Sequence, residues 1–425
     1  MSALAKAAMR RGWCPSTLKP METGDGWLVR LHPPGAQLTP EQLVRIAALA
    51  RAHGNGLVEI SARANLQLRG VTSESHPHLV EALLAERLVD EHEGNGPQRI
   101  TLVSPLAGLE QSPFIDAYVL AGAIEAAARM IAGLPPKCGV IVDDGGLSAL
   151  DAFSADIRLV ATGPGRLAMQ LADRDWRGPV AEAEAAACVI AILKGFAALR
   201  LTMPERRRLR DLTAGELAGL TDLPAAEPPR PRPAPQRVGR FAAEHEQLSV
   251  AVGLPFGRCD AAALEALAQV VETLPVTIHP SPWRGLVFTG LAGAEAEELL
   301  RVAEAAGLIT RDDDARLSIQ ACAGSPACAR GQAPAAADAG LLARALPDLL
   351  RETSLHVSGC AKGCAHPGRA NLTLVGVDGR YGVVLDGGSD DAPVAVLDLP
   401  ALLARLQAQG DWRARLAASQ TRQDA

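Results

Sequence analysis

The chain has 425 residues, of which 48% are hydrophobic and 21% charged, a balance that excludes a mostly disordered or collagen-like protein. Its length predicts several domains with substantial cores. The 42 Lys and Arg residues against 48 Asp and Glu give a net charge of -6, which provides no overall attraction to nucleic acid or anionic lipid. Any site that binds an anion must therefore be local.

The N-terminus and the cysteine content predict a cytoplasmic protein. Residues 1–11 lack the apolar core of a signal peptide, and no later stretch is expected to be long and apolar enough to span a bilayer. The chain has 8 cysteines, too few for a disulfide scaffold of this length, and half of them crowd into one C-terminal stretch. In a reducing compartment this crowding indicates a metal site.

The first half of the chain opens with a strand, a turn and a helix. An apolar strand at residues 27–31 leads to a turn at residues 33–35. The helix that follows is predicted to begin after Thr39, a good N-cap, with Gln42 placed to complete a capping box. It is predicted to end near Gly54.

Residues 57–71 are predicted to form one strand, because apolar and polar side chains alternate along them. The polar positions include Arg63 and Arg69 beside the amides of Asn65 and Gln67. A solvent-exposed sheet face explains this pattern. An anion-binding platform explains it as well, since two guanidinium groups can bind carboxylates through paired hydrogen bonds. Both interpretations stay open from this strand alone.

A faint internal repeat divides the chain at a Pro-rich linker, residues 223–238, which is predicted to be extended and not to pack as an element. The second half again shows a strand at 248–254, a helical apolar face and a second strand at 276–291. Aligning the copies pairs Leu66 with Leu286, about 220 residues apart. Chance similarity of two short patterns is the alternative explanation.

Several later elements are predicted more coarsely. A helix is expected from residues 112–113 to about residue 131, and two more at residues 292–306 and 335–346. Near the C-terminus, the pair Asp378-Gly379 between two apolar runs is typical of a hairpin with a type I′ turn. Strands and helices therefore interleave, which indicates an α+β fold.

Four cysteines form a C-x5-C pair and, after an intervening helix, a C-x3-C pair. Four thiolates from two turns match the number that a [4Fe-4S] cluster requires. A structural zinc site is the alternative, although zinc sites usually have shorter spacing in at least one pair. Unrelated buried cysteines are a third interpretation. The four candidate ligands are Cys322, Cys328, Cys360 and Cys364.

The two cysteine pairs in this order are also the signature of the sulfite and nitrite reductase superfamily, which the chain resembles over most of its length. Within that superfamily it is most similar to the precorrin-3B synthases of aerobic cobalamin biosynthesis. The residues that carry this similarity are 11–15, 20–26 and above all 358–367, whose sequence is Ser-Gly-Cys-Ala-Lys-Gly-Cys-Ala-His-Pro.

The resemblance implies two ferredoxin-like half-domains in a pseudo-two-fold repeat, together with reductase-like domains of which the C-terminal one carries a [4Fe-4S] cluster. The expected divisions are residues 12–75 and 239–306 for the half-domains, 95–222 for the first reductase-like domain, 223–238 for the linker and 307–425 for the cluster domain.

The resemblance also implies which residues bind the substrate. Arg63 resembles the arginine of the superfamily strand that faces the tetrapyrrole, Arg99 a second active-site arginine, and Lys137 the first of two lysines. The second lysine position is Gly139, and the cluster turn differs from that of a typical reductase; both departures disfavour reduction of sulfite or nitrite. The full candidate set for substrate binding is Arg63, Arg69, Arg99, Lys137 and Lys362, and no catalytic residue is assigned.

The implied reaction converts precorrin-3A into precorrin-3B: dioxygen supplies a hydroxyl group at C20, and an acetate of ring A closes a γ-lactone. The resemblance further implies a mononuclear non-haem iron beside the cluster, an NAD(P)H-linked electron donor, and neither nucleic acid nor membrane as a partner. His366, two residues after Cys364, is a weak candidate for a direct role. The second hypothesis is a sirohaem-dependent sulfite or nitrite reductase, and the third is a metal-binding or electron-transfer module without enzymatic activity.

Overall fold

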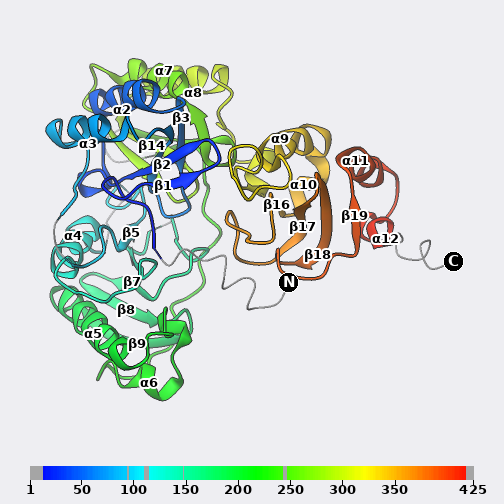
Figure 1. The fold of residues 1–425 in the computed structure, drawn as a ribbon. Coiled ribbons are helices and arrows are strands. Elements are labelled where there is room, and N and C mark those ends of the chain that lie inside the picture. Colours follow the sequence, from blue (N-terminus) through cyan, green and yellow to red (C-terminus); the bar gives the residue numbers. More distant parts are fainter. Residues whose placement is uncertain (1–12, 93–94, 110–113, 147, 243–246, 418–425) are drawn as a thin grey trace.

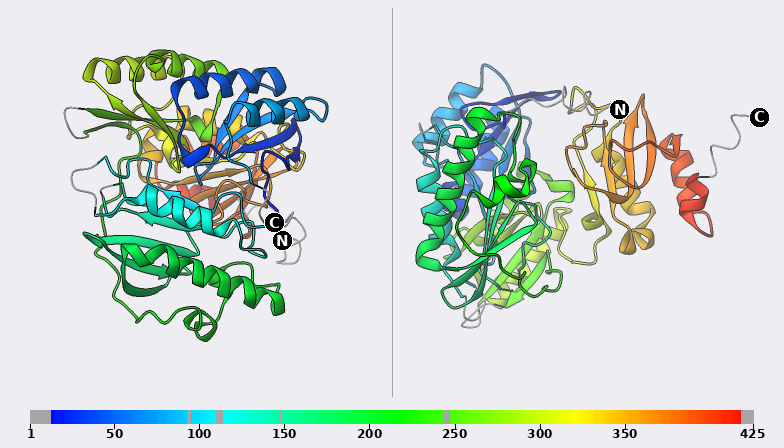
Figure 2. Two further views of the ribbon diagram at one scale, coloured as in Figure 1. Left: turned by 90° about the vertical axis from the view of Figure 1, so that its left-hand side faces the viewer. Right: turned by 90° about the horizontal axis from the view of Figure 1, so that it is seen from below.

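The computed structural model describes residues 13–92, 95–109, 114–146, 148–242 and 247–417. These residues form four β-sheets with helices packed against them (Figure 1). In Figure 2 the C-terminal unit stands beside the rest of the chain. The α+β fold predicted from the sequence is therefore confirmed.

The first half-domain begins with a local signal that the sequence showed clearly. Thr39 caps the first long helix by accepting a hydrogen bond from the Gln42 amide, and the Gln42 side chain accepts one from the Thr39 amide, so the predicted capping box is present. The helix ends at Gly54, as predicted. The elements are β1 (Met21–Thr23), β2 (Gly26–Leu31), α2 (Pro40–His53), β3 (Leu57–Ile60), β4 (Leu66–Val71) and α3 (His76–Ala85).

The second half-domain repeats this order with one added strand, β12, before its first long helix. Leu286 occupies in its last strand the place that Leu66 has in β4, and both side chains are fully buried. Gly70 and Gly290, at equivalent positions, both have positive φ angles, 70° and 90°. The elements are β10 (Gly239–Ala242), β11 (Leu248–Gly253), β12 (Arg258–Asp260), α7 (Ala261–Val271), β13 (Thr277–Ser281), β14 (Gly285–Leu291) and α8 (Gly293–Ala305).

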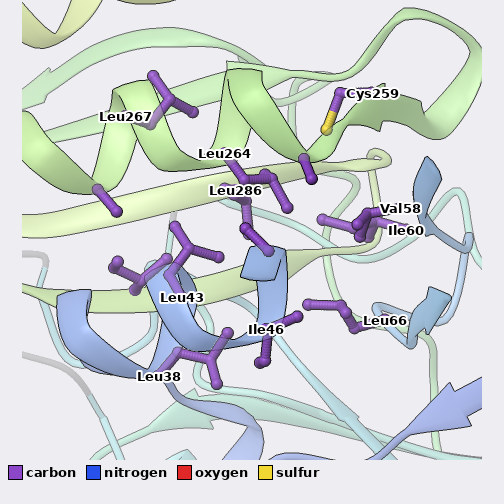
Figure 3. Packing of buried hydrophobic residues seen from close by; sticks show 14 of the residues in the cluster. Leu38, Leu43, Ile46, Val58, Ile60, Leu66, Cys259, Leu264, Leu267 and Leu286 are labelled. Carbon is purple, nitrogen blue, oxygen red and sulfur yellow. The ribbon is translucent and has the colours of Figure 1, made fainter. Parts of the chain in front are cut away.

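The two half-domains exchange strand contacts and share one hydrophobic core. Strand β12 of the second copy pairs with β3 of the first, where Cys259 faces Val58. In return, Leu38 of the first copy pairs with Ile278 in β13 through two backbone hydrogen bonds of 2.8 and 2.9 Å. Helices α2 and α7 pack over the shared core, and Figure 3 shows side chains from both copies meeting there.

The predicted strand at residues 57–71 is instead a hairpin, and the same is true of residues 276–291. Strands β3 and β4 pair antiparallel with Ile60 opposite Leu66, so residues 61–65 form a turn that carries Arg63. Because residues opposite each other in this register are both even-numbered or both odd-numbered, the alternation of polar and apolar residues continues through the turn unchanged. Alternation alone therefore could not distinguish one long strand from two short ones.

The two remaining sheets have identical strand orders, and we call them, with their helices, the first and the second five-stranded unit. In both, three strands run parallel and two antiparallel strands follow. The first contains β5 (Thr101–Val103), β6 (Val140–Asp143), β7 (Ile157–Gly163), β8 (Arg166–Leu171) and β9 (Asp175–Ala181), with α4 (Ala117–Ala128), α5 (Glu182–Thr202) and α6 (Ala214–Ala218). The second contains β15 (Ile319–Ala321), β16 (Leu355–Ser358), β17 (Ala370–Val377), β18 (Arg380–Gly387) and β19 (Ala395–Leu397), with α9 (Ala335–Ala345), α10 (Pro347–Glu352), α11 (Leu399–Gln407) and α12 (Trp412–Ala417).

Other predicted elements have mixed outcomes. The predicted start of the helix near residues 112–113 lies outside the described residues, and α4 begins after Asp116, whose side chain caps the amide of Val119. The predicted type I′ turn between β17 and β18 is confirmed, because Asp378 and Gly379 both have positive φ angles, 48° and 76°.

Helix α5 corrects the expectation that no stretch is long and apolar enough to span a bilayer. By length and composition its 21 residues meet that condition. Its buried side chains, among them Val189, Leu193 and Phe196, belong to the core under the first five-stranded sheet. An apolar helix of this kind also arises as the core helix of a folded domain.

The Pro-rich linker is extended, as predicted, but it packs more firmly than expected. The Ala226 amide donates to the carbonyl of Trp176 at 2.9 Å. Arg232 binds both carboxylate oxygens of buried Asp143, at 2.7 and 2.6 Å, and the carbonyl of Gly146 at 3.0 Å. The linker is therefore a strap fixed to the first five-stranded sheet.

The shared core predicts that equivalent substitutions in the two copies have similar costs. We expect Leu66→Ala and Leu286→Ala each to lower the free energy of unfolding by about 2–5 kcal/mol, because each leaves a cavity in the same core. Urea unfolding followed by circular dichroism measures this, with Leu201→Ala, a residue 84% exposed, as the control. A large cost in only one copy would contradict a single cooperative core.

Candidate functional site

The four candidate cysteine ligands lie in two loops at one edge of the C-terminal sheet. Cys322 follows β15 directly, and Cys360 lies two residues after β16, the parallel neighbour of β15. Neighbouring parallel strands end at the same edge of a sheet, so both cysteine loops begin at that edge. The Cys322 amide also donates to the carbonyl of Val357 at 3.2 Å, which joins the starts of the two loops.

Glycines bring these two loops into backbone contact. A β-carbon on Gly359 would lie 2.8 Å from the α-carbon of Gly324, and one on Gly324 would lie 2.3 Å from the amide nitrogen of Ala335. Gly324 also has a φ of 68°, which side chains other than glycine's rarely adopt. No other residue type would allow the two cysteine loops to approach this closely.

Backbone amides point at two of the sulfur atoms. The Gly359 amide donates to Cys322 Sγ at 3.1 Å, and the Lys362 amide hydrogen-bonds the Cys360 thiol. Burial raises the pKa of Cys360 and Cys364, and the neighbouring thiols of the other pair, Cys322 and Cys328, raise it further. The four thiols, which we call the cysteine group, therefore lie within electrostatic range of one another.

The cysteine group has the four thiols that a [4Fe-4S] cluster requires, each of which would bind a different iron. A structural zinc ion also takes four thiolates, but around one point. Across the described residues, no three His, Cys, Asp or Glu side chains are close enough together to hold one metal ion.

The same observation applies to the second, mononuclear iron. A non-haem iron of the usual type needs two histidines and a carboxylate on one face, and the described part of the chain does not assemble such a set. His366 instead bonds the carbonyl of Arg369 at 3.1 Å and packs edge-on against His356, with 5.7 Å between ring centres.

Arg69 does not join the substrate-binding set, contrary to the prediction. It is 4% exposed and binds both oxygens of Asp25, at 2.9 and 2.6 Å. Its remaining contacts are Glu59, at 3.5 Å, and the carbonyl of Ala327 in the Cys322–Cys328 loop, at 2.7 Å. Its donors are therefore used by the protein, and Arg69 holds the first half-domain against the cysteine loop.

The sequence motif at residues 20–26 acts at this same contact. The Gly24 amide donates to the carbonyl of Ala327 at 3.2 Å, and a β-carbon on Gly24 would lie 2.4 Å from the carbonyl oxygen of Pro326. Thr23 donates to Asp25 at 2.8 Å and so orients the carboxylate that Arg69 binds. The hairpin of β1 and β2 is thus docked on the first cysteine loop.

A second guanidinium docks the other cysteine loop. Arg284, in the turn between β13 and β14, donates to the carbonyl of Ala365 at 2.7 Å, directly after Cys364. Burial lowers the pKa of Arg284. The sequence reading missed Arg284, because its position in the second copy corresponds to Ala64 in the first. Each half-domain therefore contributes one arginine that fixes one cysteine loop.

Four cationic side chains come together beside the C-x3-C loop. Arg63 donates to the backbone carbonyl of Lys137 at 2.7 Å. Burial lowers the pKa of Lys137, and the charges of Arg63 and Lys362 lower it further while Cys364 opposes them, so these groups are neighbours. Arg30, Arg63 and Lys137 all interact electrostatically with Cys14, so we place Arg30 in the same group. We call Arg30, Arg63, Lys137 and Lys362 the cationic cluster.

The sequence reading did not single out Arg30. It lies in β2 between two buried apolar residues, Val29 and Leu31, a pattern that also describes an ordinary solvent-facing position. In the structure, two of its nitrogen atoms donate to the Gln67 side chain, at 3.1 and 2.9 Å. The sequence feature that could have identified Arg30 is the alternation of side chains along β2, which places it on the polar face of the sheet.

Gly139 is in contact with the cationic cluster. A β-carbon at this position would lie 3.3 Å from Nη2 of Arg63. Its amide donates to buried Asp156 at 2.9 Å, and the same carboxylate binds Arg208. A side chain at position 139 would therefore touch the guanidinium group of Arg63.

Arg99 binds the backbone of the first half-domain. Its Nη2 donates to the carbonyl of Pro33 at 2.5 Å, and burial lowers its pKa. The charges that act on it most strongly are those of Glu125, Asp90 and Arg129, not those of Arg63 or Lys137. The structure thus brings together Arg63, Lys137 and Lys362, whereas Arg69 and Arg99 bind other groups of the first half-domain.

The contact between Arg69 and Asp25 predicts a pH dependence of stability. Burial raises the pKa of Asp25, but the hydrogen bond and charge of Arg69 outweigh it, so the pKa lies below its ordinary value of 3.8. A lowered carboxyl pKa in the folded state stabilises the fold above the unfolded-state value, and this contribution disappears as the pH falls through the folded-state value.

We therefore expect Asp25→Asn to lower the free energy of unfolding by about 1–3 kcal/mol at pH 7. Urea unfolding at pH 7 and near pH 3 measures the difference, which should shrink at the lower pH. Asp313→Asn, at an exposed pair with Arg311, is the control and should change little. An equal cost at both pH values would show that the ionised carboxylate is not the source.

Comparison with known proteins agrees with this geometry. The model of the nitrite/sulfite reductase ferredoxin-like half domain matches residues 19–86 and 242–306, which lie in the two half-domains. The NirA protein of Mycobacterium tuberculosis has the same fold, with a TM-score of 0.70 at 20% identity, covering 89% of this chain and 79% of that one.

Two relatives differ in how much of the chain they match. A ferredoxin–nitrite reductase of Synechococcus elongatus is 28% identical over 35% of this chain and 30% of its own length. A precorrin-3B synthase of Sinorhizobium sp is 34% identical over 94% of this chain and 89% of its own length. Because the second match spans nearly all of both proteins, the chain, which contains two nitrite/sulfite reductase ferredoxin-like half domains, belongs to the precorrin-3B synthase family.

Proposed function

We propose that the chain converts precorrin-3A into precorrin-3B in cobalamin biosynthesis. In this reaction one oxygen atom of dioxygen becomes the C20 hydroxyl group, and the ring A acetate closes a γ-lactone. The other oxygen atom leaves as water, after uptake of two electrons and two protons. The observation that carries the proposal is the cationic cluster beside the cysteine group, because it supplies a local anion site in a chain whose net charge is -6.

The cationic cluster suits a tetrapyrrole with many carboxylates. Arg63 and Arg30 are guanidinium groups, which bind carboxylates through paired hydrogen bonds, and Lys137 and Lys362 add mobile point charges. These residues come from the first half-domain, the first five-stranded unit and the cluster domain. The binding site therefore exists only when the three units are assembled.

We further propose that the cysteine group holds a [4Fe-4S] cluster. When bound, such a cluster passes electrons one at a time, which suits a reaction that consumes two. The chain's own contribution is to hold the four sulfur atoms, to donate amide hydrogen bonds from Gly359 and Lys362, and to keep Cys364 next to Lys137. Hydrogen bonds to sulfur are one of the means by which proteins set a cluster's potential.

A sirohaem-dependent reductase is the alternative that the fold alone would permit. Against it stand the partial matches to reductases and the crowding of position 139 by Arg63. We also propose, as the sequence suggested, an NAD(P)H-linked electron donor and a cytoplasmic location.

The test of the proposed function starts from protein purified without oxygen. A broad iron-sulfur absorption that dithionite bleaches is expected, whereas sharp sirohaem bands would favour the reductase. The protein is then given precorrin-3A, a reductant and ¹⁸O₂, and mass spectrometry is expected to show one ¹⁸O atom in the product. Turnover of sulfite or nitrite without oxygen incorporation would overturn the proposal.

Replacing a proposed cluster ligand tests the cysteine group. We expect Cys360→Ser to lose most of the cluster iron and acid-labile sulfide, because the substitution removes one of the four thiolates that would bind the cluster. Iron and sulfide analysis of the anaerobic protein measures this. Cys188→Ser, in α5 and outside the cysteine group, should retain both. Full retention in Cys360→Ser would refute the ligand assignment.

Replacing Arg63 tests the substrate site. We expect Arg63→Ala to raise the Kd for precorrin-3A by about ten- to hundredfold, the cost of losing a charged hydrogen-bonding group. The cluster absorption should stay unchanged, because Arg63 bonds Lys137 and not a cysteine loop. Binding is measured by anaerobic spectral titration, with Arg301→Ala on the exposed side of α8 as the control. Unchanged affinity would remove Arg63 from the site.

A further inference from the structure

We propose that Arg208 is a positioning residue of the substrate site: it neutralises the buried carboxylate of Asp156, so that Arg63 stays available to a carboxylate of the substrate. The proposal rests on the proposed function, because Arg63 belongs to the substrate site described there. No ligand of a cluster or of iron is involved. The contacts of Asp156, its closeness to Arg63 and the neutral partner of Arg63 carry the proposal.

Asp156 is a buried carboxylate that joins two distant parts of the chain. It is 1% exposed, and its Oδ2 accepts a hydrogen bond from the Gly139 amide at 2.9 Å. Its Oδ1 accepts one from the Leu209 amide at 2.8 Å. The Nε of Arg208 lies 3.0 and 2.9 Å from the two oxygen atoms. A buried charge without a counterion is costly, so Arg208 compensates the charge that Asp156 carries.

A single glycine separates this carboxylate from Arg63. Gly139 binds Asp156 through its amide, and a β-carbon on Gly139 would lie 3.3 and 3.5 Å from two guanidinium nitrogens of Arg63. Burial lowers the pKa of Arg63, the charge of Arg208 lowers it further, and the charge of Asp156 raises it. Both partners of the buried pair therefore act on Arg63.

The hydrogen bond that the Arg63 guanidinium makes goes to a neutral group. Its Nη2 donates to the backbone carbonyl of Lys137 at 2.7 Å. A bond to a carbonyl orients the guanidinium without cancelling its charge, whereas a bond to a carboxylate would form an ion pair. Arg63 can thus bind an anion as long as Asp156 has another cation.

The segment that carries Arg208 is fixed beside the carboxylate. The Arg208 amide donates to the side chain of Asp211 at 2.9 Å, and the next residue, Leu209, is fully buried. The Arg208 side chain itself is only 14% exposed. Its guanidinium therefore has little freedom to leave Asp156.

Removing Arg208 leaves the buried carboxylate without its cation. The side chain of Arg63, on the other side of Gly139, can then turn toward the unpaired charge and withdraw its donors from the substrate. The starts of β6 and β7 stay joined in every variant, because the backbone amides of Asp156 and Ile157 donate to the carbonyl of Gly139 at 2.9 and 3.2 Å. The effect on the substrate is therefore one of charge.

Three variants separate this role from a purely structural one. We expect Arg208→Gln to raise the Kd for precorrin-3A by about tenfold, the cost of withdrawing one charged donor. Asp156→Asn should keep the Kd within about threefold of the original, because Arg63 then has no carboxylate to turn to. The double variant with both substitutions should bind as well as Asp156→Asn does. Anaerobic spectral titration of the holoenzyme measures each Kd.

Arg206→Gln is the matched control. Arg206 lies two residues before Arg208, and its guanidinium donates to the carbonyl of Asp211 at 2.6 Å, so the same substitution there should leave the Kd unchanged. Cluster absorption and thermal unfolding show whether each variant is folded. If Arg208→Gln does not fold, a Kd raised tenfold or more in Asp156→Asn or in the double variant still overturns the inference.

The outcomes separate this inference from the proposed function. If precorrin-3A binds and Arg63→Ala weakens binding, but Arg208→Gln leaves the Kd unchanged, the inference is wrong and the proposed function stands. Equal losses of affinity in Arg208→Gln and Asp156→Asn would show a structural role and would also overturn the inference. If precorrin-3A does not bind to the unsubstituted protein, the proposed function fails and the inference falls with it.

Discussion

The single core shared by the two half-domains is the constraint on which the rest of the structure depends. Because β12 completes the sheet of the first copy and Leu38 pairs with β13 of the second, neither copy buries its apolar face alone. This exchange fixes the two hairpin turns relative to each other. One turn then carries Arg63 toward the first five-stranded unit, and the other carries Arg284 toward the cluster domain.

Charged side chains connect the shared core of the half-domains to the two cysteine loops. Arg69 and Arg284 each give a guanidinium hydrogen bond to a carbonyl in one of the two cysteine loops. Isolated ion pairs on a surface contribute little, but a buried pair such as Arg69 with Asp25 cannot lose one partner without leaving a charge uncompensated. The position of the cysteine loops is therefore tied to the half-domain core, and with it their distance from Lys137.

Local features could be read from the sequence, and long-range contacts could not. The cap of α2 at Thr39 depends on residues three apart, and it was predicted correctly. The hairpin of β3 and β4 was mistaken for one strand. Opposite residues in it are both even-numbered or both odd-numbered, so the alternation of polar and apolar residues continues across the turn. Arg69 and Arg99 looked like substrate residues, but their partners, Asp25 and the Pro33 carbonyl, are 44 and 66 residues away. Their roles depend on long-range packing, which no spacing rule describes.

The linker strap makes the two sheets of identical strand order differ at one equivalent strand end. Strand β6 has the same place in its sheet as β16, after which Cys360 follows. After β6, the guanidinium of Arg232 instead binds Asp143 and the carbonyl of Gly146. The strand end of the first sheet therefore carries a closed guanidinium–carboxylate pair, whereas the equivalent strand end of the second sheet carries a cysteine loop. The two sheets share a topology and differ in the chemistry that this edge presents.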